Sequence, residues 1–473
     1  MNGLFEAAVL KRWAVLSLCF FFLFHSALPG AVGEDKPASL TIEEAYTLLK
    51  TNSETLHVKA LELQKSREMH KEVRSKALPR LTLESSASYL INPPEGMIMK
   101  KGEFGRITIP QAGSLSLPEK DVEIMPDAEH TYFKLSAVLS QPVFTWGKIR
   151  NAINLARLQV EISGLELEKQ EADLKREAHR AYYGAVLARE SGVELQKLKE
   201  ILLDILSDRE KNFKAGTLNR QSVLEAREKV AELETQLIEA EESQRTSLES
   251  LGILTGVDPE NVELTSSFRQ ELPLMDEELL KEQVIKSAKE VEIFRKRVIQ
   301  AQKKLKIAQG SSMLLPDLFL SLAFDVKGQR IPLAGANWTD TWDWDLIISV
   351  GTKVDLFDSG ESFFKIKEAE KELQMASFSL SEYEKVLKLQ VRQNIQAMKK
   401  AYYETLEKSA RIERNREQLK NAEVSFENEL ITREEYLGSQ AASISTNLEY
   451  LFSLYTFEEA LSDLEYLLDR SFK

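Results

Sequence analysis

Hydrophobic and polar residues follow two different periods along this chain, and both periods occur twice. A stretch with helical spacing ends at Pro79 and another at Pro316, because proline has no N–H with which to continue a helix. After each proline the hydrophobic residues recur at every second position, as in a β-strand with two unlike faces. The repetition of this order in both halves indicates an internal duplication.

Four segments have this period of two, namely residues 80–89, 133–140, 317–325 and 342–351. Each segment is close to the ~9–11 residues that a tilted strand needs to cross a bilayer. A soluble sheet with one buried face has the same period. A membrane is favoured because Trp338, Trp342 and Trp344 cluster at one end of the last segment, as in the aromatic girdle of a membrane protein.

These segments predict two β-hairpins, residues 80–144 and 317–357, whose connections are expected to be loops. The first connection covers residues 92–130 and the second covers residues 328–341. Pro79 and Gly147 are 68 residues apart, whereas Pro316 and Gly360 are 44 apart, so the first repeat is 24 residues longer here. We assign the extra length to the first loop, because the outward loops of membrane strands vary in length.

A long helical hairpin follows each β-hairpin. Helical spacing is continuous over 147–213 and 360–426, which corresponds to helices on the order of 100 Å long. The first helix reverses at Gly216, which adopts a left-handed conformation at no steric cost. Return helices are predicted over 219–254 and 432–469. The two helical hairpins span residues 147–254 and 360–469, and a constant spacing of 213 residues relates them, for example Phe144 to Phe357.

Shorter helices precede each β-hairpin. Thr41 and Glu44 have the spacing of a capping box, which predicts a short helix that begins there. A second helix is predicted over 54–77, and the other half has one continuous helix over about 276–309. Residues 257–273 lack a helical period and are expected to supply a short strand between the repeats.

Residues 1–33 have the features of a secretory signal: Lys11 and Arg12, then an apolar run, then small residues up to Gly33. The apolar run is shorter than the ~20 residues of a membrane-spanning helix. It contains Cys19, the only cysteine, so the remaining chain has no thiol for a disulfide or a nucleophile. The predicted organisation is a signal over 1–33, a first repeat over 34–256 and a second repeat over 257–473.

Composition and charge exclude several function classes. The chain has 62 Lys and Arg against 75 Asp and Glu, and a net charge of −13 opposes binding to nucleic-acid phosphates. Its carboxylates lie beside Lys and Arg at helical spacing, and it has no phosphate-binding glycine loop, nucleophile elbow or His/Cys metal motif. Met97 and Met99 in the first loop are too few to predict a soft-metal site. We therefore predict no enzyme activity, no cofactor and no metal.

The order of elements resembles that of the TolC-like outer membrane efflux proteins, or outer membrane factors. The resemblance covers essentially the whole chain after the signal segment. Its most specific parts are Phe-Asp-Ser-Gly-Glu at 357–361, where a long helix begins, and Phe213-Lys-Ala-Gly216-Thr-Leu218 at the first helical turn. In the second repeat Phe426-Glu-Asn-Glu429-Leu-Ile-Thr432 occupies the equivalent turn, with Glu429 in place of the glycine.

The resemblance implies a mainly α fold with a small β part. Three copies would form a trimeric 12-strand β-barrel and a 12-helix α-barrel, which solves the problem that four strands cannot close a barrel alone. It implies a passive exit duct of a tripartite efflux pump or a type I secretion system. The duct would lie in the outer membrane of a Gram-negative bacterium, in contact with outer-membrane lipid, with a long periplasmic portion. Implied partners are a periplasmic adaptor (membrane fusion) protein and an inner-membrane pump or ABC exporter.

The resemblance also implies functional residues at the two helical tips. Candidates for a periplasmic aperture are Thr432, Glu434 and Glu435, and candidates for adaptor docking are Gly216, Thr217, Leu218, Glu429 and Leu430. Carboxylates of three copies in a constriction would favour cations. The alternative interpretation of equal weight is that Glu434 and Glu435 are solvent-facing acids at a helix start, where the helix dipole stabilises them.

A second functional hypothesis is a periplasmic adaptor or scaffold with coiled-coil hairpins that never spans the membrane. Adaptors usually present one helical hairpin beside compact β-domains, whereas this chain alternates two helical hairpins with two amphipathic strand pairs. An enzyme with a helical body is the third hypothesis, and no group of residues supports it.

Overall fold

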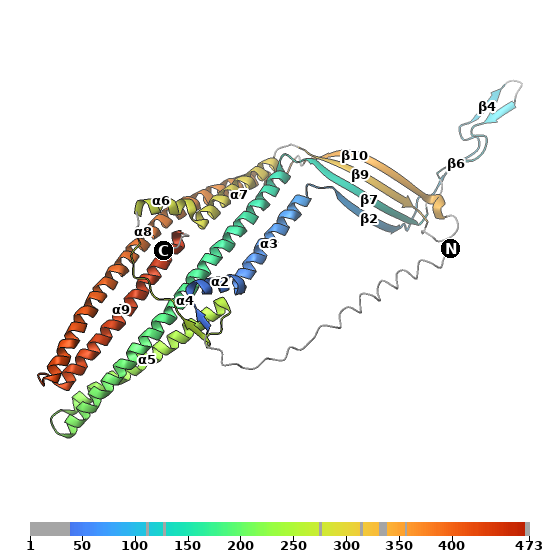
Figure 1. Cartoon of the computed structure of the whole chain (residues 1–473). Coiled ribbons are helices and arrows are strands. Elements are labelled where there is room, and N and C mark those ends of the chain that lie inside the picture. The colour runs from blue at the N-terminus through green and yellow to red at the C-terminus, as the bar shows by residue number, and fades with distance from the viewer. Residues whose placement is uncertain are drawn as a thin grey trace.

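The computed structural model describes residues 38–109, 113–125, 129–273, 277–312, 316–330, 338–354 and 357–468. The predicted signal segment, residues 1–33, lies outside these ranges. The described chain is elongated, with a β-sheet at one end and the turns of two long helical hairpins at the other (Figure 1). The prediction of a mainly α fold with a small β part is confirmed.

Two pairs of long helices form the body, and the members of each pair have matching lengths. Helices α4 (Lys148–Lys214) and α8 (Glu361–Glu427) have 67 residues each. Helices α5 (Arg220–Thr255) and α9 (Arg433–Leu468) have 36 residues each. Gly147 and Gly360 precede α4 and α8 with φ of 78° and 85°, a left-handed conformation that glycine adopts freely. Both long helices therefore begin with the same change of chain direction.

Short elements pack against the middle of the helical body. We call residues 38–52 and 257–273, with the helix residues that contact them, the waist. Strand β1 (Ala38–Leu40) pairs in parallel with β8 (Val262–Leu264), so the strand predicted within 257–273 is confirmed. Helix α2 (Ile42–Asn52) begins with the predicted capping box, in which Thr41 and Glu44 bond to each other's backbone N–H groups. Helix α3 (Glu54–Ser75) follows and leads to the sheet.

One helix prediction is wrong, because the helix expected over 276–309 is divided. Helix α6 (Glu277–Ser287) and helix α7 (Lys289–Ser312) meet at Ala288, which is buried. The break allows Val284 of α6 and Val291 of α7 to reach the same hydrophobic cluster against α8 and α9. Tertiary packing thus overrides a sequence that is helical on both sides of the break.

The main sheet has four antiparallel strands in the order β10-β9-β7-β2. These strands are β2 (Arg80–Tyr89), β7 (Thr131–Phe144), β9 (Asp317–Gly328) and β10 (Trp342–Lys353). A short 3-10 helix, η1 (Trp338–Thr341), leads into β10. In this order β2 and β10 are the edge strands. The central pair, β7 and β9, joins the two halves of the sequence.

The connection from β2 to β7 is not the irregular loop that the sequence predicted. It contains the strands β3 (Met97–Met99), β4 (Arg106–Ile109), β5 (Gly113–Ser116) and β6 (Val122–Met125). Strand β3 pairs with β6, and β4 pairs with β5, both antiparallel. We call residues 97–109 and 113–125 the arm, and it projects beyond the end of the sheet, away from the helices (Figure 1). The expectation of a loop is wrong because cross-strand pairing orders this polar, glycine-containing segment.

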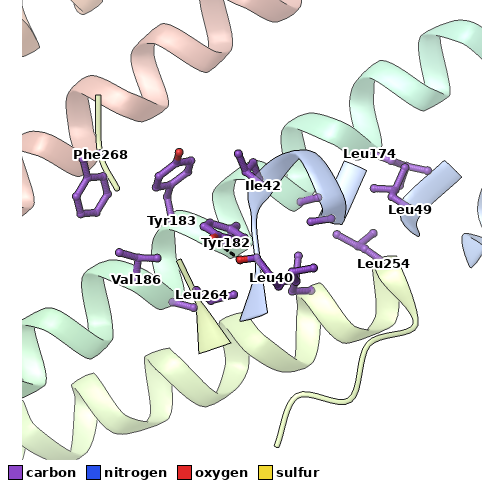
Figure 2. Close-up of a cluster of buried hydrophobic side chains, with 14 of the residues drawn as sticks. Leu40, Ile42, Leu49, Leu174, Tyr182, Tyr183, Val186, Leu254, Leu264 and Phe268 are labelled. Carbon is purple, nitrogen blue, oxygen red and sulfur yellow. Dashed lines mark hydrogen bonds between the residues drawn. The ribbon is translucent and has the colours of Figure 1, made fainter. Parts of the chain in front are cut away.

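Tyr182 of α4 fixes the waist to the helical body. Its side chain is fully buried among Leu40, Leu264 and neighbouring apolar residues (Figure 2). Its hydroxyl donates a hydrogen bond to the Leu40 carbonyl at 2.7 Å and accepts bonds from the N–H groups of Thr265 and Ser266 at 3.0 and 2.8 Å. One side chain therefore bonds to three backbone groups of the waist. The Thr265 N–H and the Leu40 carbonyl also bond to each other at 3.2 Å, so the Ser266 N–H depends most on the Tyr182 hydroxyl.

Replacement of Tyr182 by phenylalanine should destabilise the chain by about 1–3 kcal/mol, because the buried Ser266 N–H loses its partner while the ring still fits. Chemical denaturation followed by circular dichroism measures the effect. Tyr403→Phe is the matched control, since the Tyr403 side chain is exposed. Equal denaturation midpoints for the two variants would contradict this role of the Tyr182 hydroxyl.

Candidate functional site

The apolar face of the main sheet is exposed along its whole length. Leu83 is 67% exposed, Trp344 66% and Ile348 73%, although all three lie within regular strands. The pairing register brings apolar side chains of neighbouring strands to the same face, for example Ile348 opposite Leu322. No described element of the chain covers this face. A hydrophobic surface of this extent marks contact with a membrane or another protein.

The opposite face of the sheet is polar and carries ion pairs between strands. Lys327 of β9 bonds to Asp345 of β10 at 2.8 Å, and Lys134 of β7 lies 3.9 Å from Asp325 of β9. Ser136 donates a hydrogen bond to the same Asp325 carboxylate. The sheet is therefore divided into one apolar face and one charged face, as the period of two predicts.

The three tryptophans predicted to form an aromatic girdle lie at the end of the sheet near the arm. Trp342 stacks on Phe133 with ring centroids 6.3 Å apart, and its indole N–H donates to the Arg330 carbonyl at 3.0 Å. Trp344 lies on the exposed apolar face, 6.1 Å from the ring of Phe324. Trp338 begins η1, but its side chain is outside the part that the structure describes.

A second aromatic group, which the sequence analysis missed, lies at the other end of the sheet, where the strands meet the helices. Phe144 and Trp146 contact edge to face at 4.8 Å, and Phe363 and Phe364 do the same at 5.5 Å. Phe357 is 86% exposed. The sequence could have indicated this group, because its aromatic residues lie beside the two glycines at which the long helices begin, Gly147 and Gly360. Aromatic side chains thus flank the apolar face at both ends, as they do at lipid–water boundaries.

The helical tips have the same backbone geometry despite different sequences. Gly216 has φ of 78° and Glu429 has φ of 57°, so both are left-handed. The N–H of Thr217 bonds to the Asn212 carbonyl at 3.0 Å, and the N–H of Leu430 bonds to the Ser425 carbonyl at 2.8 Å. Thr217 and Leu430 are exposed, as is Glu429, whereas Leu218 is half-buried.

The aperture candidates are close in sequence but make different contacts. Glu435 accepts hydrogen bonds from the N–H and hydroxyl of Thr432, and these two bonds, the backbone one first, lower the pKa of Glu435. Glu434 instead accepts a bond from Arg209 of α4 at 2.9 Å. Glu435 is therefore an exposed capping residue, whereas the charge of Glu434 is compensated by a cation from the other helical hairpin.

Further ion pairs join the two hairpins near the tips. Arg433 of α9 bonds to Asp204 at 2.8 Å and to Asp208 at 2.7 Å, both on α4. All these side chains are partly exposed, so solvent and salt weaken the attraction between them. Sequence reasoning missed these contacts because the paired residues are more than 200 positions apart.

The waist contains a buried charge cluster that the sequence did not reveal. Glu458 of α9 is completely buried and bonds to the Arg269 guanidinium and, at 2.9 Å, to the Arg269 backbone N–H. Arg269 also bonds to Glu465 at 2.8 Å. His179 Nε2 lies 3.2 Å from Glu458, and its Nδ1 bonds to the Tyr46 hydroxyl at 2.8 Å. Residues from α4 and from the segment between β8 and α6 thus meet at one carboxylate of α9, and Tyr46 of α2 joins the cluster through His179.

Burial alone would raise the pKa of Glu458, but the contacts with His179 and Arg269 outweigh it and lower the pKa to about 2. Among the described residues, no group of three or more His, Cys, Asp or Glu side chains is arranged to hold a metal ion. The described helices include none that is long and apolar enough to cross a membrane.

Comparisons with known proteins agree with this geometry. The family model described as outer membrane efflux protein matches residues 45–257. The Campylobacter jejuni CmeC outer membrane channel has a TM-score of 0.71 at 15% identity, with 90% of this chain and 85% of that chain covered. The Vibrio cholerae outer membrane protein VceC has a TM-score of 0.69 at 14% identity, with 91% and 97% covered. No curated protein matches the sequence significantly.

A third structure, the Neisseria gonorrhoeae MtrE outer membrane channel in its open state, has a TM-score of 0.65 at 14% identity, with 91% and 89% covered. At these identities the likeness shows a shared fold, and this fold is that of outer membrane channels. Together with the family match in the first half of the sequence, it confirms the predicted resemblance. Residues 45–257 of the chain thus match the outer membrane efflux protein family, and the fold resembles that of the TolC-like channels.

Replacement of Glu458 by glutamine should destabilise the protein by on the order of 3 kcal/mol at pH 7, because the lowered pKa measures how strongly the folded state favours the carboxylate. A depressed pKa adds stability above the unfolded-state value of about 4.5, and this contribution is lost as the pH falls to about 2. The difference between wild type and Glu458→Gln should therefore decrease steadily as the pH falls from 4.5 towards 2.

Denaturant midpoints measured at pH 7 and pH 3 test this expectation. Glu459→Gln is the matched control, because Glu459 is the next residue on α9 but is partly exposed and pairs with Arg180. A constant difference between wild type and Glu458→Gln across this pH range would contradict the role of the buried carboxylate.

Proposed function

We propose that this chain is one protomer of a trimeric exit duct in the outer membrane of a Gram-negative bacterium. The observation that carries the proposal is the four-stranded sheet with an exposed apolar face and two free edges. Unpaired backbone groups cost several kcal/mol each in lipid, so a sheet of this kind needs partners at both edges.

The directions of the edge strands support closure by identical copies. Strand β2 runs antiparallel to β7, β7 to β9, and β9 to β10, so β2 and β10 run in opposite directions. Pairing β10 of one copy with β2 of the next therefore continues the antiparallel order. Four strands from each of three copies would give a closed barrel of about 12 strands, wide enough to enclose a channel.

The helical body, like the sheet, has two outer sides. Helices α3 and α5 form one side, and α8 forms the other. Helices contact one another in the order α3-α4-α7-α8 near the sheet and α5-α4-α9-α8 nearer the tips. Exposed apolar residues occur on the outer helices, such as Met375 and Phe378 on α8, Val58 and Leu61 on α3, and Ile238 on α5. Contact between α8 of one copy and α3 and α5 of the next would bury these side chains and close a helical tunnel.

The proposed duct also gives a role to the two structural repeats of the sequence. We infer a first repeat over 34–256 and a second over 257–473, each of which supplies one strand pair and one helical hairpin to a common wall. A 67-residue helix is about 100 Å long, which suits a long periplasmic portion. The tips, with Gly216, Thr217, Leu218, Glu429 and Leu430, are proposed to dock a periplasmic adaptor. An inner-membrane pump or ABC exporter would supply the energy for transport.

A periplasmic scaffold that never enters the membrane is not favoured. Such a protein would have to cover the apolar face of the sheet with another element of its own chain, and no described element does so. Membrane fractionation separates the two functions, because a scaffold would be recovered in the soluble periplasmic fraction.

Arginine at Ile348, in the middle of the exposed apolar face, should oppose membrane insertion by about 2–4 kcal/mol, because the charge must enter hydrocarbon. The expected result is a marked loss of folded protein from the outer-membrane fraction. The control is Ser349→Arg, because the neighbouring side chain lies on the polar face. Similar membrane yields for both variants would exclude a lipid-facing role of this surface.

The proposed duct should conduct ions in planar bilayers and prefer cations, with Glu435 contributing most at the tip because Arg209 compensates Glu434. Glu435→Gln should lower the cation-to-anion permeability ratio roughly twofold at low salt, where charges are least screened. Reversal potentials in a KCl gradient measure this ratio. Glu241→Gln, an exposed change on α5 away from the tip, should leave it unaltered. Absence of conductance from folded trimers would refute the duct itself.

A further inference from the structure

The arm has one hydrophobic face without a partner in its own chain. Met97 is opposite Met125, and Met99 is opposite Val122, in the β3–β6 pair. Opposite residues share a face of a strand pair, and a register shift between Met97 and Ile98 leaves Ile124 unpaired beside Met125. These four side chains therefore lie together, while Ile98 and Glu123 lie on the other side. Met97 is 62% exposed, Met125 57% and Val122 46%. The sequence analysis identified only Met97 and Met99, and the strand pairing adds Met125 and Val122 to the same face.

Hydrogen bonds join the two strand pairs of the arm, and further contacts order the end of the sheet from which the arm arises. Between β3–β6 and β4–β5, Phe104 and Leu117 are joined by a backbone hydrogen bond of 3.0 Å, and the Lys101 N–H bonds to Asp121 at 2.7 Å. At its base, the Leu90 N–H bonds to the His130 carbonyl, and the His130 ring stacks on Tyr89 at 5.4 Å. The arm therefore begins at an ordered end of the sheet.

The position of the arm identifies what covers its hydrophobic face. It arises from β2, an edge strand, so it stands at the boundary where one copy would meet the next. It also projects past the end of the sheet that bears Trp342, beyond the apolar band of the strands (Figure 1). A lipid-covered face is expected within that band, not beyond it.

We propose that the three arms of a trimer pack against one another through Met97, Met99, Val122 and Met125 and cover the outer mouth of the channel. This inference rests on the proposed trimer. Threefold symmetry places identical arms at the same level, and attachment to one assembly gives them a high effective concentration. Methionine side chains are flexible and polarisable, which suits packing against copies of themselves around an axis.

Single-cysteine variants of the full chain test this contact. Cys19 is the only native cysteine, so a Cys19→Ser background removes any other thiol. In trimers purified in mild detergent, mild oxidation of Met97→Cys or Met125→Cys should yield a disulfide-linked dimer on a non-reducing gel. Glu123→Cys, on the opposite face of the arm, is the matched control and should yield about tenfold less.

A second variant keeps the test independent of a single cysteine position. Val122→Cys should cross-link in the background chain, and addition of Met97→Glu and Met125→Glu should abolish this cross-link while the trimer remains, because the charges separate the arms. Equal cross-linking of Met97→Cys and Glu123→Cys in intact trimers would overturn the proposal and leave lipid, a soft metal or another protein as the cover. A monomeric product on a sizing column would instead refute the trimer, and the arm contact with it.

Discussion

The structure depends on one constraint: a four-stranded sheet with an apolar face and two open edges cannot exist alone in a membrane. Strands β2 and β10 leave a row of unpaired N–H and C=O groups at each side, and lipid offers these groups no hydrogen-bond partner. In the proposed trimer, the two helical hairpins of each copy would also have to be equal in length for all the tips to end at one level. The matched lengths of α4 and α8, and of α5 and α9, satisfy this requirement.

The interactions that hold the helical body together differ from the waist to the tips. At the waist, the Glu458 carboxylate is buried with Arg269 and His179, and removal of one member of such a group leaves a buried charge without compensation. At the tips, the pairs of Arg209 with Glu434 and of Arg433 with Asp204 are partly exposed. Exposed pairs contribute about 0–1 kcal/mol, so the hairpins are joined strongly at the waist and weakly at the tips.

Local chemistry made much of the fold predictable. Pro79 and Pro316, the capping box at Thr41 and the alternation at Trp342–Val350 each act within a few residues, so a single sequence reveals them. The break at Ala288 and the pairing of Met97 with Met125 depend on segments that come together only in the folded chain. The same holds for the candidate site: the positions of Glu434 and Glu435 were predictable, but the compensation of Glu434 by Arg209, 225 residues away, was not.

The exchange of Gly216 for Glu429 shows how the two repeats came to differ. A left-handed residue other than glycine costs about 1 kcal/mol, yet Glu429 adopts this conformation and closes the same turn as Gly216. The substitution therefore leaves the backbone unchanged and adds a carboxylate to a tip that already carries Glu434 and Glu435. The difference between the tips is consequently one of charge and not of shape. In a ring of three copies, the second tip would bring together Glu429 and Glu435, whereas the first turn carries Lys214 and no acid.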